Sequence, residues 1–300
     1  MIVFDHVPVL LPEVLDALKP AAGEVHVDCT LGGGGHAEAL LEAAPCRVIG
    51  LDRDPEALAA STERLRAFGD RFTPVRAAFS ELGGVLDRLG VDRVDGVLAD
   101  LGVSSPQLDR AERGFSFQQA GPLDMRMDPD APLTAADLVN EAPEQELADL
   151  IFRYGEERRA RRVARQIVAG RPWADTRTLA RAVAKAVGGK PGRIHPATRT
   201  FQALRIAVND ELGELERLLP VARERLRPGG RLALITFHSL EDRIVKRFFA
   251  RESGRTAPRD AYGDPVGPVR FGELRQAVPA PDDPNPRARS ARLRAATRLP

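Results

Sequence analysis

The sequence predicts an α/β fold in which a parallel β-sheet is covered by helices on both faces and is interrupted by an inserted helical domain. Over the first hundred residues, near-continuous apolar segments of strand length alternate with amphipathic helical segments. This pattern is typical of parallel strands that are buried on both faces. The alternation stops between about residues 106 and 210 and resumes with the apolar segment Arg231–Phe237. We therefore expect a discontinuous α/β domain, 1–105 and 211–300, and an inserted helical domain, 106–210.

The first half of the expected sheet follows from four apolar segments and from the helix signals between them. A helix opens at Ala37 after a run of glycines, and Asp54-Pro55 supplies the N-cap and first-turn proline of a helix through Phe68. Ser80 is the expected cap of a further helix. The strands expected here are Val25–Asp28, Arg47–Asp52, Phe72–Ala77 and Val94–Asp100.

The second half of the chain is expected to be helical first and then to complete the sheet. Arg227–Gly230 is an expected turn before the strand Arg231–Phe237, and Ala291–Thr297 is an expected last strand. The stretch Gly254–Pro286 is rich in proline, glycine and charge and gives few signals of order. The helices expected are Gly155–Val168, Thr176–Val187, Asp210–Leu226 and Asp242–Arg251.

A glycine-rich turn that is typical of nucleotide sites follows the first expected strand. Asp28 ends this strand, and four glycines at 32–35 lead into the first helix. Glycines let the backbone turn tightly and approach a ligand without a Cβ clash. Asp52 ends the next strand about 20 residues further on, where a carboxylate can accept both hydroxyls of a ribose. The spacing Gly32-x-Gly34-x-x-Ala37 also fits the dinucleotide fingerprint, so the turn alone leaves the adenosine-type cofactor open.

Three features favour the methyl donor S-adenosylmethionine over a nicotinamide dinucleotide. Asp28 precedes the glycines, where an acid can meet a cationic amino acid moiety. Asp100 ends the strand 94–100 and adds a polar contact at the sheet edge where ligands bind. The turn Arg227–Gly230 before an apolar strand is frequent in class I methyltransferases, and nothing resembles a His–carboxylate pair for hydride transfer. An NAD-dependent dehydrogenase is the first alternative, and a non-catalytic RNA-binding or assembly factor is the second.

The composition is that of an ordinary soluble globular protein with one large or two ordinary domains. The 300 residues are 43% hydrophobic and 29% charged, and no stretch approaches the ~20 continuous apolar residues of a membrane span. The N-terminus lacks the basic head and apolar run of a signal peptide. Cys29 and Cys46 lack metal-ligand spacing, which favours buried thiols in a reducing compartment. We therefore expect a cytoplasmic protein.

Positive charge is concentrated in the stretch 153–205, although the net charge of the whole chain is only +1. This stretch holds fourteen Lys and Arg residues and three acids, Glu156, Glu157 and Asp175, which leaves about eleven excess positive charges. Such a local excess in a neutral protein indicates a polyanionic partner. The rival interpretation is a general preference for arginine, in which these side chains only solvate helix faces. The scarcity of opposing acids favours nucleic acid over this rival.

Several longer motifs occur in one order along nearly the whole chain. They are His6–Leu11, Asp52–Pro55, Asp100–Gln107, Glu112–Phe117, Pro122–Met127, Tyr154–Glu157, His195–Gln202, Phe237–Arg243 and Asn285–Ser290. Together they resemble the motifs of the small-subunit ribosomal RNA cytosine-N4 methyltransferase family, known as MraW or RsmH. The resemblance implies a Rossmann-like class I S-adenosylmethionine-dependent methyltransferase with an inserted all-helical domain for RNA recognition. It also implies methylation of N4 of a cytidine in the decoding region of 16S ribosomal RNA.

Carried over residue by residue, the resemblance implies a set of cofactor contacts. This set is Gly34, Gly35, His36, Asp52, Phe79, Asp100 and Gln107. The loop backbone would approach the amino acid part of the donor, Asp52 would hold the ribose, and Phe79 would pack on adenine. Relatives often place larger residues within the four-glycine run, and we expect little change because the contacts there are mainly made by the backbone.

The resemblance also implies the partners. These are 16S ribosomal RNA or the small ribosomal subunit, with no membrane partner, and a homodimer is left open. The basic insertion together with Arg287 and Arg289 would hold RNA phosphates. The acids Asp124, Asp128 and Asp130 lack the signature of a metal-binding loop, so no metal is expected.

The chemistry requires placement of a weak nucleophile more than activation of a strong one. The exocyclic amine of cytosine is a poor nucleophile because its lone pair is delocalised into the ring. In-line placement of this nitrogen against the methyl group and acceptors for its N–H bonds are needed, without a covalent adduct. Ser104, Ser105 and His238 are the candidates for these contacts, with Asp242 as a further polar partner. The base has to be presented unstacked, because a duplex hides the reacting nitrogen.

Three of these residues also have an ordinary structural interpretation. His36 can cap the helix that follows the glycines, and Phe79 can be part of the core. His238 can be a buried histidine with satisfied hydrogen bonds. DNA cytosine or protein substrates also stay open when the residues are considered without the resemblance.

Overall fold

The computed structural model describes residues 8–188, 194–280, 283, 285 and 288–300. The chain folds into two compact units, which we call unit 1 (Met1–Gly102 and Leu212–Pro300) and unit 2 (Val103–Glu211). Each unit buries hydrophobic side chains of its own. None of the helices in the described ranges is long and apolar enough to cross a membrane.

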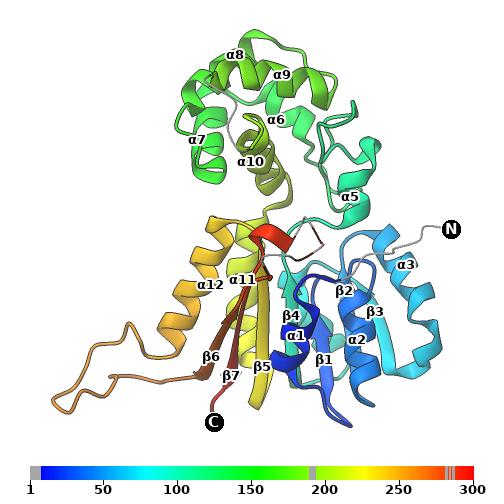
Figure 1. Ribbon diagram of the computed structural model, residues 1–300, viewed down its shortest axis with the longest axis vertical. Coiled ribbons are helices and arrows are strands. Elements are labelled where there is room, and N and C mark those ends of the chain that lie inside the picture. The colour runs from blue at the N-terminus through cyan, green and yellow to red at the C-terminus, as the bar shows by residue number, and fades with distance from the viewer. Residues whose placement is uncertain (1–7, 189–193, 281–282, 284, 286–287) are drawn as a thin grey trace. The chain divides into compact units, whose positions relative to one another are not determined.

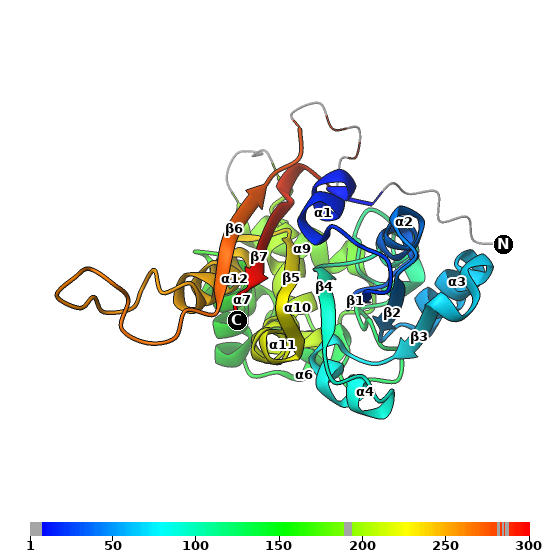
Figure 2. The same ribbon diagram turned by 90° about the horizontal axis from the view of Figure 1, so that it is seen from below.

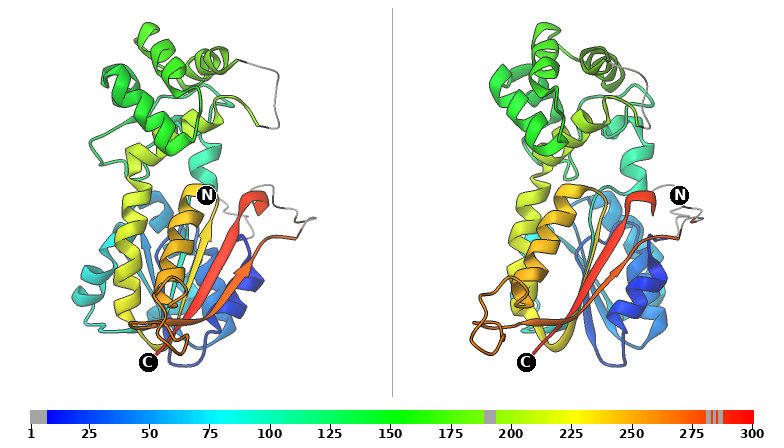
Figure 3. Two further views of the ribbon diagram at one scale, coloured as in Figure 1. Left: turned by 90° about the vertical axis from the view of Figure 1, so that its left-hand side faces the viewer. Right: turned by 60° about the vertical axis from the view of Figure 1, so that its left-hand side comes forward.

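Unit 1 is built on a seven-stranded sheet with the strand order β3-β2-β1-β4-β5-β7-β6 (Figure 1). β1 to β5 pair in parallel, whereas β7 runs antiparallel to both β5 and β6. Figure 3 shows β7 and β6 beyond β5 in both of its views. The expected Rossmann-like α/β fold is thereby confirmed, with an antiparallel pair added at one edge. The strands are β1 (Val25–Asp28), β2 (Arg47–Asp52), β3 (Phe72–Arg76), β4 (Val94–Asp100), β5 (Leu226–Thr236), β6 (Phe271–Ala277) and β7 (Arg292–Arg298).

Helices cover both faces of this sheet (Figure 2). On one face lie α1 (Leu11–Leu18), α2 (Gly35–Ala43) and α3 (Pro55–Arg64). On the other face lie α4 (Leu82–Arg88), α11 (Glu211–Arg225) and α12 (Ser239–Glu252). Side chains of β4 alternate between the two cores, since Val97 and Ala99 join the cluster with α4 and α11 while Leu98 joins the cluster with α1 and α2. Burial on both faces explains why the strand segments are apolar almost throughout.

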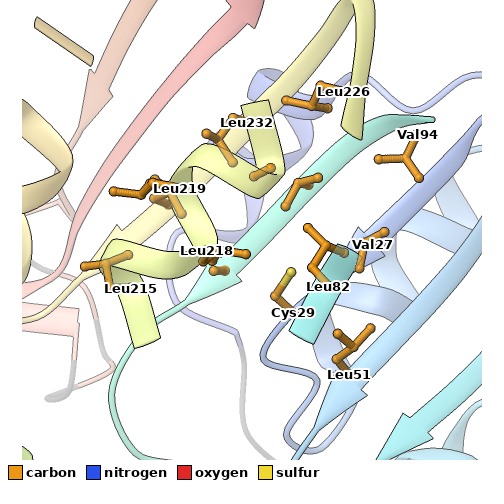
Figure 4. Close-up of a cluster of buried hydrophobic side chains, with 14 of the residues drawn as sticks. Val27, Cys29, Leu51, Leu82, Val94, Leu215, Leu218, Leu219, Leu226 and Leu232 are labelled. Atoms are coloured by element: carbon orange, nitrogen blue, oxygen red, sulfur yellow. The ribbon is translucent and has the colours of Figure 1, made fainter. Parts of the chain in front are cut away.

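The core under α11 illustrates how one helix closes its face of the sheet. Leu215, Leu218 and Leu219 of α11 lie over the strands in Figure 4, in one cluster with Val27 and Leu232. Each of these side chains is almost completely removed from solvent. Such burial stabilises the fold by about 1.5–3 kcal/mol for each large aliphatic side chain.

Unit 2 consists of helices joined by loops in its described residues. Its core includes Leu147 and Ile151 of α7, Val163 and Ile167 of α8, and Phe201 of α10. The helices are α5 (Ser105–Asp109), α6 (Ala135–Glu141), α7 (Glu144–Gly155), α8 (Ala160–Ala169), α9 (Thr176–Val187) and α10 (Thr198–Asn209), with a short 3-10 turn at Ala111–Arg113.

The expected helix Gly155–Val168 is wrong at its start, because Gly155 ends α7 instead of opening a helix. A Cβ at Gly155 would lie 2.5 Å from the carbonyl oxygen of Arg199, so a glycine lets α7 approach α10 closely. The chain then turns at Glu156, which has a φ of 49°. Glu157 accepts a hydrogen bond from the Arg159 amide ahead of α8.

The helix expected to begin at Ser80 also begins elsewhere. Ser80 lies inside a 3-10 turn, Phe79–Glu81, and α4 starts only at Leu82. The amide of Ser80 donates to Glu214 Oε2 at 3.3 Å, while Glu81 Oε2 accepts from the Ala78 amide. The carboxylate of Glu81 therefore caps the 3-10 turn, and α4 itself begins without a side-chain cap.

The expected turn Arg227–Gly230 is an outward loop within β5. Leu226 pairs with Val94 and Arg231 pairs with Gly96, so the four residues between them oppose a single residue of β4. Gly229 has a φ of 82°, which suits a glycine in this loop.

β6 lies in the stretch Gly254–Pro286, where few signals of order were found in the sequence. It is an edge strand that pairs with β7 alone, and its register shifts between Gly272 and Arg275. Most of its side chains are at least partly exposed, while Phe271 is buried among Phe248 and Phe249. The strand thus lacks the apolar run on which its recognition from sequence would depend.

Candidate active site

Three aspartates end neighbouring parallel strands of unit 1, and we call them the acidic edge. Asp28 ends β1, Asp52 ends β2 and Asp100 ends β4. Carboxyl ends of parallel strands meet at one edge of a sheet, and β1 and β4 flank the point at which the strand order reverses. Ligands of such folds bind at this position, so the acidic edge is the candidate site.

The glycine-rich turn between β1 and α2 is fixed against the acidic edge. Gly32 and Gly34 have φ values of 49° and 81°, which favour glycine. The amide of Gly32 donates to Asp52 Oδ2 at 2.8 Å. A Cβ at Gly35 would lie 2.5 Å from the Cγ of Pro8, so the start of α2 has no room for a side chain. The turn therefore presents backbone, not side chains, next to the acids.

Asp52 is held by two backbone amides. Besides the bond from Gly32, its Oδ1 accepts from the amide of Asp54 at 2.9 Å. Burial raises the pKa of Asp52 to about 6, against these hydrogen bonds and the nearby charge of Arg53, which lower it. Each carboxylate oxygen retains a further lone pair that can accept a hydroxyl.

Asp28 and Asp100 each carry a buried carboxylate oxygen without a hydrogen-bond partner among the described residues. These atoms are Oδ2 of Asp28 and Oδ1 of Asp100. Burial raises the pKa of Asp28 to about 7. Burial, with the charges of Asp28 and Glu241, also raises the pKa of Asp100 well above its usual range. Unsatisfied buried oxygens are costly in folded proteins, and carboxyl groups with strongly shifted pKa values cluster at functional sites.

His36 does not neutralise the negative charge of the carboxylates at the acidic edge. It is 6% exposed, its Nε2 donates to the Val9 carbonyl at 3.0 Å, and its Nδ1 lies 3.8 Å from Asp100 Oδ2. Burial lowers the pKa of His36 to about 4, so the ring is neutral at pH 7. With the proton on Nε2, the Nδ1 lone pair faces Asp100. His36 and Asp100 are therefore not an ion pair, and His36 contributes no positive charge to the acidic edge.

Phe79 lies in the 3-10 turn beyond β3, partly buried against the core of unit 1. The guanidinium carbon of Arg53 lies 5.7 Å from the centre of its ring. The ring is therefore both a core residue and one side of a cation–π contact. Packing on adenine stays a prediction.

His238 is not on a strand, because β5 ends at Thr236 and His238 is the N-cap of α12. Its Nδ1 accepts from the Glu241 amide at 3.4 Å, and its Nε2 lies 3.2 Å from Glu241 Oε1. Glu241 in turn accepts from the amides of Phe237 and His238. Nδ1 therefore caps α12, whereas Nε2 lies near the glutamate but has no hydrogen-bond partner among the described residues.

Ser104, Ser105 and Gln107 belong to unit 2, where they form the start of α5. Gln107 is 5% exposed, and its Oε1 accepts from the Ser104 amide at 3.0 Å. Ser105 is the first residue of the helix. Their predicted roles stay predictions, as does the whole set of site residues.

Sequence reasoning missed two residues that act on the acidic edge. Thr30 bonds to both Asp28 and Asp100, and Glu241 adds charge near Asp100. Thr30 could have been found from its position, because its hydroxyl follows the strand-end acid Asp28 by two residues. The signal for Glu241 was its position three residues after a capping histidine.

Unit 2 carries an arginine surface on α8, which we call the basic face. Arg161, Arg162 and Arg165 lie on the exposed side of this helix, opposite Val163 and Ile167. Arg158, just before the helix, is exposed as well. Arg158, Arg161 and Arg162 have no hydrogen-bond or ion-pair partner within the part of the chain that the structure describes.

Other basic residues of this stretch have structural partners. Arg159 donates to the Val187 carbonyl, Arg171 donates to the carbonyls of Val139 and Ala142, and Arg205 pairs with Glu211. Fewer arginines of the stretch 153–205 are therefore free to bind an anion than the count of positive charges in the sequence suggests. Arg289 is exposed in a 3-10 turn. Arg287, Lys190 and Arg193 lie outside the described residues.

The sheet order, the glycine turn after β1 and the acids at three strand ends define a Rossmann-like α/β protein of the class I methyltransferase type. The chain belongs to the MraW methylase family, whose model matches residues 3–299.

Three relatives are each named ribosomal RNA small subunit methyltransferase H. The protein of Geobacter sulfurreducens is 54% identical, with 99% of each chain covered. That of Methylobacterium sp. (strain 4-46) is 55% identical over 98% of this chain and 90% of its own. That of Carboxydothermus hydrogenoformans is 52% identical over 99% of this chain and 98% of its own.

Among solved structures, a putative rRNA-methylase from Clostridium thermocellum matches with a TM-score of 0.47 and 14% identity. The match covers 98% of this chain and 100% of that one. The family assignment rests on the sequence matches.

Proposed function

We propose that this protein transfers a methyl group from S-adenosylmethionine to N4 of a cytidine in the decoding region of 16S ribosomal RNA. The observation that carries the proposal is the acidic edge, where Asp28, Asp52 and Asp100 lie together and the adjacent His36 is neutral. Such a site favours a ligand with positive charge. The names of the relatives support ribosomal RNA as the substrate.

The residues at the acidic edge fit an adenosyl donor with a cationic amino acid part. Asp52 would accept the two ribose hydroxyls with the lone pairs that the Gly32 and Asp54 amides leave free. Asp100 would hold the cationic part, and Gly34 and Gly35 would let the backbone approach it. His36, Phe79 and Gln107 complete the proposed set of cofactor contacts.

The same chemistry disfavours a nicotinamide dinucleotide. The pyrophosphate of a dinucleotide would add negative charge beside Asp28 and Asp100, both of which lack a compensating hydrogen bond at one oxygen. A negative charge next to a buried carboxylate raises the pKa of that carboxylate further, so the pyrophosphate would weaken binding of the dinucleotide.

In the proposed reaction the bound donor would supply an electrophilic methyl group on a positively charged sulfur. The bond from sulfur to methyl breaks as the bond from N4 to methyl forms, S-adenosylhomocysteine leaves, and N4 releases one proton to solvent. The protein has to hold the weakly nucleophilic N4 in line with this group and accept its N–H bonds. Ser104 and Ser105 are proposed as acceptors at the start of α5. His238 is assigned to holding the base, because accepting a proton at Nδ1 would break its cap on the Glu241 amide.

The basic face is proposed to bind the phosphates of the substrate RNA. Its unpartnered arginines carry full charge at the surface, where a polyanion gains affinity through release of counterions. Binding of this kind is insensitive to sequence, so the choice of cytidine has to be made near the acidic edge.

Methyl transfer to small ribosomal subunits tests the proposal. Particles from cells that lack this protein are incubated with labelled S-adenosylmethionine, digested to nucleosides and analysed by mass spectrometry. We expect N4-methylated cytidine, and particles from cells that contain the protein are the saturated control. Label on a ring carbon of cytosine would contradict the N4 assignment. Tight donor binding without transfer would instead favour a non-catalytic assembly factor.

A further inference from the structure

We propose that Thr30 is a positioning residue whose side-chain hydroxyl joins the ends of β1 and β4, and so sets Asp28 and Asp100 for a cationic ligand. The inference rests on the proposed function, because it concerns the site assigned to the methyl donor. It adds a residue that touches neither the donor nor the RNA in that proposal.

The geometry around Thr30 is specific. Its Oγ1 accepts a hydrogen bond from the Asp100 amide at 2.6 Å, and its own amide donates to Asp28 Oδ1 at 3.1 Å. The hydroxyl proton is not used in the bond from Asp100, so it can be donated, and the Thr30 hydroxyl lowers the pKa of the neighbouring Asp28. One threonine thereby connects the two acids of the edge that have unpartnered oxygens.

The position of Thr30 explains why a side chain is needed. The ladder between β1 and β4 ends with the bond from the Cys29 amide to the Leu98 carbonyl at 2.8 Å. Beyond Cys29 the chain leaves the sheet for the glycine turn, so β1 offers no further backbone carbonyl to the Asp100 amide. The Thr30 hydroxyl takes the place of that carbonyl and extends the pairing by one residue.

Loss of the hydroxyl has two consequences that act in the same direction. The Asp100 amide loses its acceptor, so the end of β4 is no longer fixed, and a buried N–H without a partner is costly. Asp28 also loses the neighbouring hydroxyl that lowers its pKa and so favours its ionised form. Both changes weaken the attraction of the edge for a cation, whereas the hydrophobic cores on either side stay unchanged.

The test compares Thr30→Val, which replaces the hydroxyl by a methyl group, with Thr30→Ser, which retains it. Binding of S-adenosylhomocysteine to the full chain is measured by calorimetry, which is independent of turnover. We expect Thr30→Val to raise the Kd about tenfold, the effect of about 1.4 kcal/mol from one lost hydrogen bond. Thr30→Ser is expected to stay within about threefold of wild type.

A matched control is Thr236→Val, another buried threonine of unit 1, whose hydroxyl donates to the Arg292 carbonyl. We expect this variant to lose stability without a comparable change in Kd. A Kd for Thr30→Val that equals wild type would overturn the inference, and so would a Thr30→Ser variant as weak as Thr30→Val.

Hydrogen exchange of the Asp100 amide tests the same bond in the wild-type protein, even if Thr30→Val does not fold. We expect this amide to be protected before any ligand is added, and to be protected in Thr30→Ser. Free exchange in the wild type would overturn the inference. Failure of the wild type to bind S-adenosylhomocysteine would instead overturn the proposed function, so the two failures can be told apart.

Discussion

The acidic edge of unit 1 and the basic face of unit 2 hold charge in opposite ways. At the acidic edge, Asp28 is 1% exposed, and its position is fixed by backbone hydrogen bonds at a strand end. On the basic face, Arg158, Arg161 and Arg162 are exposed and have no partner within the described residues. The first arrangement costs stability and the second costs almost none.

This difference indicates two kinds of recognition. Buried and crowded carboxylates interact strongly with one small cation in one geometry, because few water molecules screen them. Exposed arginines interact with many phosphates in many geometries, and salt weakens that interaction. We therefore expect changes at the acidic edge to affect donor binding steeply, and changes at the basic face to affect RNA binding in a salt-dependent manner.

The largest expected effect comes from Asp100→Ala. Removing this carboxylate should raise the Kd for S-adenosylhomocysteine about a hundredfold, since a hydrogen bond to a charged group contributes about 1.5–3 kcal/mol. Calorimetry on the full chain measures it. Asp16→Asn is the control, because this acid of unit 1 is exposed and pairs with Arg275. If Asp100→Ala bound S-adenosylhomocysteine as well as wild type does, the role of the acidic edge in donor binding would be contradicted.

The next effect comes from reversing the charge of Arg158, Arg161 and Arg162 to Glu. RNA affinity should fall about tenfold or more at low salt, and the slope of log Kd against log salt should fall by about 0.7 for each lost phosphate contact. Donor affinity should not change. Filter binding at several salt concentrations measures the RNA affinity and its slope against salt. Arg66→Glu in unit 1 is the control. An RNA affinity of the variant equal to that of wild type, at both low and high salt, would refute a role for the basic face.

A pH dependence should distinguish the two regions further. Asp28, with a pKa of about 7, and Asp52, with a pKa of about 6, bind protons in the ligand-free protein. The titratable and charged groups that also act at this edge include Asp54 and Arg53 beside Asp52, together with Asp100, Glu241 and neutral His36. A cationic ligand favours the ionised forms, so its affinity should rise as pH rises, by about tenfold from pH 6 to pH 8 for one proton near pH 7.

The stability of the ligand-free protein should change in the opposite direction. A folded-state pKa of Asp28 above its unfolded value means that the folded protein binds more protons, so stability falls as pH rises from about 4 to 7. Each pH unit costs about 1.4 kcal/mol for one such group. Thermal unfolding with and without S-adenosylhomocysteine measures this, and a ligand-free stability that rises over this range would contradict it.

The smallest expected effect concerns the backbone at the acidic edge. Gly35→Ala places a Cβ 2.5 Å from Pro8 Cγ, and such overpacking should cost about 1–3 kcal/mol of stability and reduce donor affinity severalfold. Gly84→Ala in α4 is a matched control, since its nearest neighbour is a flexible arginine atom at 3.6 Å. We expect the control to be neutral or slightly stabilising. Similar losses in both variants would show that helix glycines, and not the turn, are responsible.

Much of unit 1 follows from local sequence. β1, β2 and β4 are apolar runs whose pattern reflects burial on both faces, and each ends in an aspartate that the sequence places at one sheet edge. Asp54 caps α3 as expected, with its Oδ1 accepting from the Glu56 amide. These features depend on residues close together in the chain, so a local pattern is sufficient to predict them.

The sequence by itself therefore determined the fold class, the glycine turn and the acids at the strand ends. Tertiary structure decided which charges are compensated, because partners such as Thr30 for Asp100, Val9 for His36 and Val187 for Arg159 come from distant segments. It also decided the edge strand β6, which has little apolar pattern and forms by pairing with β7. The physical reason is that periodicity reports burial, whereas hydrogen bonding and electrostatics depend on which segments meet in space.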